Sequence, residues 1–228
     1  RNRELPPIGK VEGPAKRRLR IGLVLDSIND QPTDAETRAA TEQAGRLLER
    51  LGHHVEPAII PLDRQFITDF VTYYGGLALA IQRLGPVLFG KTFRAERLND
   101  MTLSLARMGR ENFWKLPGAI RRLRKTRHTY ATFFDTLDVV LTPTVGTTPP
   151  PLGWLDPHIP YDELMTRFIN FMSFTPANNA SGAPAISLPL GQSSKGLPIG
   201  IQLAAKEGDE RTLLELAFEL EAAQPFRR

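Results

Sequence analysis

Ser181 is the residue that looks most like a catalytic nucleophile, because it lies in the small-residue run Asn-Ala-Ser-Gly-Ala. A serine hydroxyl attacks a carbonyl only when a base takes its proton. No histidine, lysine or carboxylate neighbours Ser181 in the sequence, and the chain has no Gly-x-Ser-x-Gly elbow. The pattern therefore favours a turn or helix-cap role for this hydroxyl.

Other reactive groups are scarce. The 228-residue chain has no cysteine and only four scattered histidines, and it lacks a Walker loop, a Gly-x-Gly-x-x-Gly fingerprint and a His-Glu-x-x-His motif. We therefore expect no metal and no cofactor. Lys195 lies in a predicted hairpin turn, where a solvated lysine stays protonated and cannot act as a general base.

Two segments place polar residues where a ligand could bind. Thr142, Pro143 and Thr144 end a predicted strand before a long loop, and residues past the carboxyl end of such a strand commonly line a ligand crevice. The second segment, 174–191, is rich in small residues and precedes the apolar strand that contains Gln202. A buried glutamine needs partners, so Gln202 either braces a loop or faces a site.

The elements that must position these residues alternate between strands and helices. Apolar runs predict strands at 19–25, 53–60 and 138–141, and a helix lies between the first two, from a Thr33/Glu36 capping box to Gly52. Residues 185–189 and 198–203 predict two further strands. Strand, helix, strand within about 40 residues indicates an α/β fold, a mixed sheet with flanking helices.

The remaining segments are helical or irregular. Residues 63–137 predict a long helical excursion with breaks at Gly85-Pro86, Gly90 and Pro117-Gly118. Residues 143–160 are too proline-rich for regular pairing, residues 161–174 predict a helix, and Asp209 caps a last helix to about Ala223. Residues 1–18 have no packing pattern and predict a linker, so that 19–228 forms one part of a domain.

Charge and hydropathy exclude some partners. No run approaches the roughly 20 apolar residues of a membrane helix, so we expect no membrane partner, and the absence of cysteine fits a cytoplasmic protein. The densest basic run, 121–127, has no interleaved aromatics for base stacking. It predicts a solvated helix face, and nucleic acid is not expected as a partner.

In these segments the sequence resembles the amidase signature hydrolases. The resemblance rests on the order of Asp-Val-Val-Leu-Thr-Pro-Thr144, the segment Thr175–Gly191, Gly-Leu-Pro-Ile-Gly-Ile-Gln-Leu203 and Gly208-Asp-Glu. It covers about residues 19–221 and is similar to the C-terminal portion of the family, in an α/β/α fold. Because the chain starts at Arg1 rather than Met, we expect it to be part of a longer protein.

The resemblance implies hydrolysis of a carboxamide by a serine nucleophile, a second serine on a cis peptide bond and a neutral lysine. Burial must lower the pKa of that lysine so that it can accept a proton. Nothing in this chain matches the Gly/Ser-rich signature segment, and none of its seven lysines stands in the catalytic context. We therefore expect no catalytic residue in this chain, which alone should be inactive.

The resemblance also implies what this portion can contribute. It would complete the sheet with the N-terminal remainder of the domain and form part of the acyl pocket for a small-molecule amide. Thr142, Pro143 and Thr144 are the expected pocket neighbours, and Asn178, Asn179 and Gln202 the expected braces or substrate contacts. The aromatic residues of 66–114 would suit a hydrophobic acyl group, but core packing is the favoured explanation for most of them.

Two questions stay open on the sequence. The protein is either part of an active amidase or a catalytically degenerate homologue that acts as a binding or partner module. Its oligomeric state is also open, and a homo-oligomer is compatible with the sequence.

Overall fold

The computed structural model describes residues 5, 7–29 and 31–225. By its internal contacts the chain divides into two units. The first unit comprises residues 1–62, 126–150 and 171–228, and the second comprises residues 63–125 and 151–170. The prediction that 19–228 forms one part of a domain stays a prediction.

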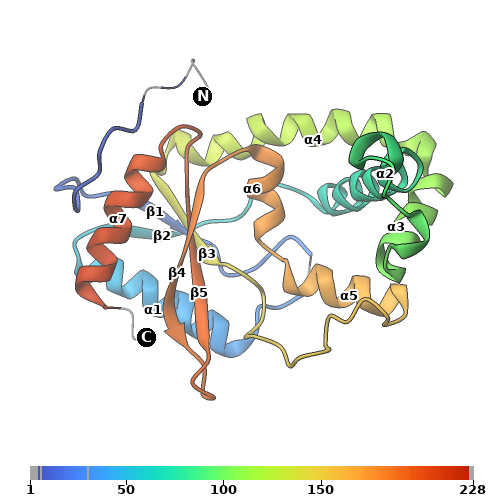
Figure 1. The fold of residues 1–228 in the computed structure, drawn as a ribbon. Coiled ribbons are helices and arrows are strands. Elements are labelled where there is room, and N and C mark those ends of the chain that lie inside the picture. Colours follow the sequence, from blue (N-terminus) through green and yellow to red (C-terminus); the bar gives the residue numbers. More distant parts are fainter. Residues whose placement is uncertain (1–4, 6, 30, 226–228) are drawn as a thin grey trace. The chain divides into compact units, whose positions relative to one another are not determined.

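The first unit is built on a five-stranded sheet (Figure 1). Its strands are β1 (Arg20–Leu23), β2 (His54–Pro57), β3 (Val139–Pro143), β4 (Ala185–Gln192) and β5 (Pro198–Ala205), in the order β2-β1-β3-β5-β4. β2, β1 and β3 run parallel, whereas β5 is antiparallel to β3 and to β4. The predicted mixed sheet is confirmed.

Helices cover both faces of this sheet. Apolar residues of α1 (Ala35–Arg50) and α7 (Glu210–Ala223) pack with Ile21, Leu141 and Leu203 in one core. On the other face, α6 (Thr175–Ser181) and the 3-10 helix η3 (Thr132–Asp135) pack with Val140 in a second core. Figure 1 shows α7 and α6 on opposite sides of the strands. The predicted α/β class with flanking helices is confirmed.

The predicted Thr33/Glu36 capping box at the start of α1 is wrong. Asp34 is the N-cap, because its carboxylate accepts from the amide of Thr37 at 2.9 Å. Thr33 instead donates to the carbonyl of Leu25, and Glu36 accepts from the amide and hydroxyl of Ser194. These hydrogen bonds lower the pKa of Glu36. Gly52, with φ of 91°, ends the helix region as predicted.

The second unit is helical. It contains α2 (Arg64–Phe89), the 3-10 helix η1 (Ala95–Arg97), α3 (Asp100–Glu111), the 3-10 helix η2 (Phe113–Lys115), most of α4 (Leu116–Ala131) and most of α5 (Tyr161–Phe171). The predicted break at Gly85-Pro86 is wrong, because α2 continues through Pro86 to its end three residues later. The break at Gly90 is confirmed. The predicted break at Pro117-Gly118 is wrong, because both residues lie in the first turn of α4, where a proline needs no hydrogen-bond partner for its nitrogen.

Close backbone contact joins α2 to α3. A Cβ atom added to Gly109 would lie 2.1 Å from the carbonyl oxygen of Gly75, so only glycine fits at this crossing. The carboxylate of Asp69, buried in α2, also accepts two hydrogen bonds of 2.6 Å from the Arg122 guanidinium in α4. A bidentate pair of this kind fixes the orientation of both side chains.

The predicted helix 161–174 is confirmed as α5, which ends three residues earlier, at Phe171. The sequence did not predict α6, which starts at Thr175 with Pro176 in its first turn. The predicted linker has no helix or strand at residues 5 and 7–18, and its residues 1–4 and 6 lie outside the described residues. Within the described ranges, no helix combines the length and apolar character needed to span a bilayer.

Candidate functional site

The sheet reverses its winding between β1 and β3. From β1 the chain passes through α1 to β2 on one side, whereas β3 pairs with β1 on the other side. In sheets of this kind, ligands bind in the crevice outside the carboxyl ends of the two strands that flank the reversal. The described residues of the loop after β1, 24–29 and 31–34, and the loop that starts after β3 at residue 144 therefore define the candidate site.

Asp34 ties these two loops together. Its amide donates to the carbonyl of Gly146 at 3.0 Å, and its carboxylate accepts from the amide of Thr148 at 2.6 Å. The same carboxylate caps α1, so one side chain fixes the helix start and the loop after β3. This brings the loop into the region that the strand order predicts for a ligand.

A strip of polar side chains lies on the α6 face of the sheet next to this crevice. Strand side chains alternate between the two faces, so residues two apart share a face. Thr142 in β3 and Thr144 just after it therefore share the face of Val140, which packs in the core on the α6 side. Cross-strand pairing places Gln202 of β5 beside Thr142, and Ser187 of β4 beside Gln202. The sheet register therefore gathers two predicted segments at one place.

Two hydroxyl groups form the outer part of this strip. The Oγ1 atom of Thr144 and the Oγ atom of Ser187 are 2.6 Å apart, and Ser187 is exposed. Gly200 lies between them, and a Cβ atom there would be 2.9 Å from the Thr144 oxygen and 3.0 Å from the Ser187 oxygen. The missing side chain of Gly200 thus gives this hydroxyl pair its room.

The inner part is a buried hydrogen-bond network. Tyr130, Thr142, Asn178 and Gln202 are 2%, 3%, 9% and 5% exposed. The Nε2 atom of Gln202 donates to Thr142 Oγ1 and to Asn178 Oδ1, each at 3.3 Å, and Thr142 donates to the carbonyl of Pro143 at 2.7 Å. Three separate segments, β3, β5 and α6, are joined in this way, so Gln202 acts as a brace.

Tyr130 closes the network at its far end. Burial raises the pKa of its phenol far above the ordinary value, and the hydrogen bond from Asn178 opposes that shift. The phenol is therefore neutral at physiological pH, and the whole network carries no net charge. It can hold the sheet and α6 in place, but it cannot serve as a charged acid or base.

The predicted site residues thus have different surroundings. Thr142, Asn178 and Gln202 meet in the network, Thr144 contacts Ser187, and Pro143 is a buried strand residue. Asn179 is exposed and does not join them. Ser181 is buried at the end of α6, where its hydroxyl contacts the carbonyl of Asn178 and the amide of Ala183, each at 3.3 Å. That is the helix-cap role the sequence favoured.

Tyr130 and Ser187 are the residues of this strip that sequence reasoning missed. Ser187 could have been found from alternation, since Leu188 and Leu190 face the opposite core and leave 187 on the α6 face. Tyr130 had no comparable signal, because only the tertiary fold brings it to Asn178.

No lysine side chain is buried in the described part of the chain. All seven lysines, Lys10, Lys16, Lys91, Lys115, Lys125, Lys195 and Lys206, are exposed. A lysine needs a buried site to be neutral at physiological pH. The described part of the chain also contains no group of three or more side chains suited to a metal ion.

Known proteins match this chain over most of its length. It is 47% identical to the proteins named "Putative amidase AmiC" of Mycobacterium bovis and Mycobacterium tuberculosis, across 100% of this chain and 48% of theirs. It is 30% identical to the 6-aminohexanoate-cyclic-dimer hydrolase of a Pseudomonas species, across 91% of this chain and 44% of that protein.

Solved structures agree with these sequence matches. A 6-aminohexanoate cyclic dimer hydrolase complexed with substrate superposes with a TM-score of 0.82 at 28% identity, covering 97% of this chain and 48% of that chain. The chain thus spans about half the length of the curated relatives it matches. The model of the Amidase family matches residues 5–214. The chain therefore belongs to the amidase family, as its ordered motifs suggested.

Proposed function

We propose that this chain is the C-terminal part of an amidase that hydrolyses linear carboxamide C–N bonds with a serine, a cis-serine and a lysine. In this reaction the serine oxygen bonds to the carbonyl carbon and the amine leaves with a proton. Water then cleaves the acyl ester to give the carboxylic acid. The catalytic groups lie in the remainder of the protein, and this chain completes the sheet and one wall of the acyl pocket.

One observation carries this proposal. The whole chain matches about half of proteins named as amidases, while its seven lysines are exposed and its one suggestive serine, Ser181, is bonded to the end of α6. A chain that holds the family fold but no buried lysine is suited to shaping a site rather than to performing the chemistry.

The wall that this chain supplies is the polar strip and the loop after β3. Its accessible hydroxyl groups are those of Ser187, which is exposed, and Thr144, which is half-buried. The residues behind them are buried and support them: Thr142, Pro143, Asn178 and Gln202. Asn179 is exposed on α6 and is proposed as a substrate contact. Thr147, in the adjoining loop, has a buried hydroxyl oxygen without a hydrogen-bond partner among the described residues.

The N-terminal remainder is the proposed partner within the same protein. β4 is an edge strand of eight residues, and no strand of the described part pairs with its outer edge. An uncovered edge of this length readily pairs with another strand. A strand supplied by the remainder would continue the sheet there. A homo-oligomer of complete proteins is compatible with this pairing.

The first test compares the complete protein with this chain alone on a panel of aliphatic and aryl amides. Release of amine and carboxylic acid is measured for both. We expect turnover by the complete protein and none by residues 1–228. Turnover by this chain alone would refute the assignment of catalysis to the remainder. No turnover by the complete protein, with binding of an amide retained, would favour the degenerate homologue.

The second test addresses the wall. Ser187→Ala and Thr144→Val in the complete protein each remove one hydroxyl group while the outer strip keeps its shape. For a substrate whose acyl group forms a hydrogen bond there, KM should rise by up to roughly tenfold with little change in kcat. Ser194→Ala is the matched control, because Ser194 lies in the β4–β5 turn and contacts Glu36. Unchanged KM in both wall variants would exclude this strip from the pocket.

A further inference from the structure

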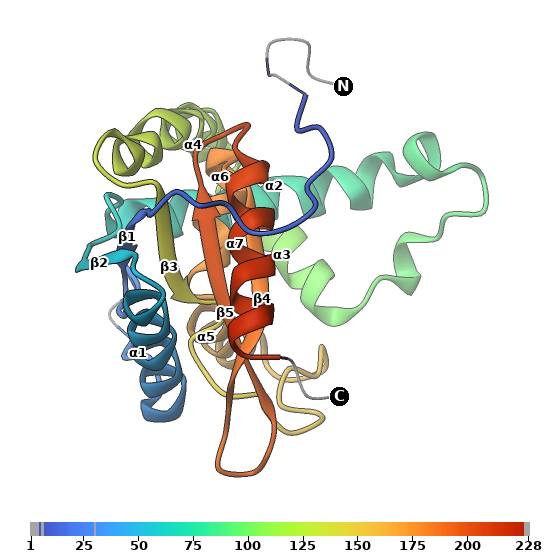
Figure 2. The ribbon, with the colours of Figure 1, turned by 90° about the vertical axis from the view of Figure 1, so that its left-hand side faces the viewer.

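Residues 7–18, which we call the strap, pass across α7 (Figure 2). Polar contacts hold the strap in place. The Arg211 guanidinium of α7 donates to the carbonyl of Ile8 at 2.9 Å, and Arg18 donates to the carboxylate of Glu219, also in α7, at 2.6 Å. Arg17 pairs with Asp138. The strap has no helix or strand of its own, so these side chains fix its path.

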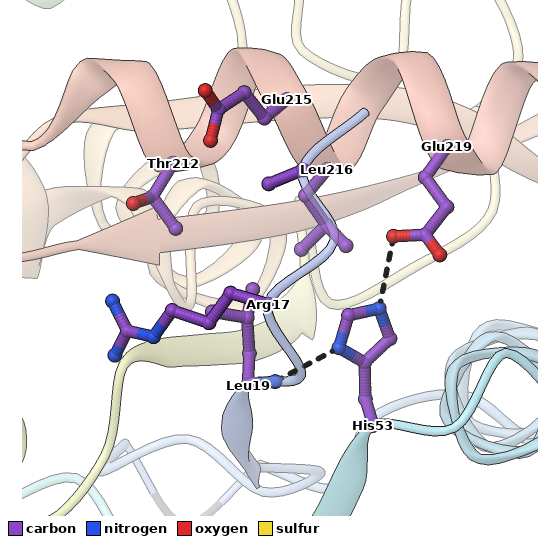
Figure 3. A pocket seen from close by; sticks show the side chains of 8 residues that line it. Arg17, Leu19, His53, Thr212, Glu215, Leu216 and Glu219 are labelled. Carbon is purple, nitrogen blue, oxygen red and sulfur yellow. Dashed lines mark hydrogen bonds and ion pairs between the residues drawn. The ribbon is translucent and has the colours of Figure 1, made fainter. Parts of the chain in front are cut away.

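A small cavity of about 60 Å³ lies where the strap meets α7 and the start of β2 (Figure 3). Its lining comprises Ala15, Arg17, Leu19, His53, Thr212, Glu215, Leu216 and Glu219. The His53 side chain, only 1% exposed, is the deepest polar group there. Figure 3 shows its ring between the backbone of Leu19 and the carboxylate of Glu219.

The hydrogen bonds of His53 fix its tautomer. The amide of Leu19 can only donate, and it lies 3.1 Å from Nδ1, so Nδ1 must be unprotonated. The hydrogen atom is therefore on Nε2, which donates to Glu219 Oε2 at 3.1 Å. Since Nε2–H and the Arg18 guanidinium both donate, their 3.4 Å approach is a close contact through the shared carboxylate rather than a hydrogen bond.

The consequence is a clamp with one acid-sensitive bond. His53 at the start of β2, Leu19 at the start of β1 and Glu219 in α7 are joined through one ring, and Glu219 also holds Arg18 of the strap. A second proton on the ring can bind only at Nδ1, where it would point at the Leu19 N–H. Two donors cannot share that position, so protonation must break the hydrogen bond.

We propose that His53 is an acid-sensitive clamp where the strap enters β1: its neutral ring accepts the hydrogen bond from the Leu19 amide, and its protonated ring releases that amide while staying on Glu219 of α7. No catalytic role fits the same ring, because both of its nitrogens are used. The inference is independent of the amidase reaction, since it concerns the amino ends of β1 and β2, whereas the candidate site lies at the carboxyl ends of β1 and β3.

The charges around the His53 ring limit the effect of protonation to its hydrogen bond with the Leu19 amide. From the strap, Arg17 lines the cavity and the Arg18 guanidinium lies 3.4 Å from Nε2, and both charges oppose a positive imidazolium. From α7, Glu219 favours it, while Glu215 is already paired with Arg211 at 2.8 Å. Asp138 is engaged with Arg17. Glu219 can therefore keep the protonated ring in place, and the bond to Leu19 is the one that is lost.

Hydrogen exchange of the complete protein tests the proposal. From about pH 7.5 to about pH 5, after correction for the intrinsic rate, protection of the peptide that contains Leu19 should fall on the order of tenfold. In His53→Asn the side-chain oxygen can still accept from Leu19 but cannot gain a proton, so the pH dependence should vanish. His54→Asn is the matched control, because His54 is adjacent but exposed, and should behave like the wild type.

A second measurement covers the case in which His53→Asn does not fold. Nitrogen-15 spectra of the wild-type protein at neutral pH should give a pyridine-type signal for Nδ1 of His53 and a pyrrole-type signal for Nε2. The opposite tautomer, an imidazolium at neutral pH, or protection of Leu19 that does not change with pH would each overturn the proposal. So would a pH dependence that persists in His53→Asn.

Discussion

At the scale of single residues, buried polar groups set the geometry of the candidate site. A buried amide or hydroxyl costs free energy unless it is hydrogen-bonded. Gln202, Asn178 and Thr142 satisfy one another across three elements, and this requires α6 to stay at one position on the sheet. An apolar replacement could fill the same volume, but it would not specify that position.

Tyr130 gives a prediction for alkaline solution. Burial raises its pKa in the folded state, so its contribution to stability is complete below the unfolded value of about 10 and is lost as pH rises through the raised folded value. Tyr130→Phe in the complete protein should therefore lose about 1 kcal/mol at neutral pH, with the hydrogen bond to Asn178, yet resist alkaline unfolding better than wild type.

The check is a series of urea unfolding curves from neutral pH to above pH 10. Tyr74→Phe is the control, because Tyr74 is exposed in α2. Parallel pH dependence for wild type and Tyr130→Phe would mean that the buried phenol is not what destabilises the fold in alkali.

At the scale of elements, α7 depends on a cap that the sequence predicted. Asp209 accepts from the amide of Thr212 at 3.4 Å and from its hydroxyl at 2.8 Å. Asp209→Ala should lower the free energy of unfolding by about 1 kcal/mol, because the first turn loses its acceptor. Asp209→Asn keeps an acceptor and should lose clearly less. Equal losses for the two variants in urea unfolding would show that charge, rather than the hydrogen bond, matters.

The crossing of α2 and α3 is the second element-scale prediction. Gly109→Ala would place Cβ against the backbone of Gly75, which cannot move as a flexible side chain can. We expect a loss of about 1–3 kcal/mol or more. In Gly118→Ala, within α4, the nearest atom would be a nitrogen of the Arg122 guanidinium at 3.4 Å, an ordinary van der Waals distance, and this variant should be neutral or stabilising. Thermal unfolding of both variants makes the comparison.

At the scale of the whole molecule, the free edge of β4 predicts how residues 1–228 behave alone. Unpaired strand edges promote association, so this chain should self-associate when produced by itself and should become monodisperse when the remainder is produced with it. Light scattering and cooperative melting of the two preparations measure this. A cooperatively melting monomer of residues 1–228 alone would contradict the proposed strand pairing.

Much of the fold could be predicted from the sequence, since apolar runs and turn residues marked all five strands and the cap of α7. The errors came from local competition. Asp34 rather than Thr33 caps α1, because a carboxylate one residue later reaches both the helix and Thr148. α6 was missed because its seven residues, including Pro176 and two asparagines, have little helix propensity and fold against the sheet.

The sequence by itself determined the fold class, the family and the absence of thiol and metal-motif chemistry, because motif order and composition are properties of the chain alone. Only the tertiary structure decided which polar residues meet. Gln202 joins Asn178 and Thr142 while Asn179 faces away, and Ser187 reaches Thr144 over Gly200. Strand register and helix docking set these contacts between residues far apart in sequence, and no local pattern encodes them.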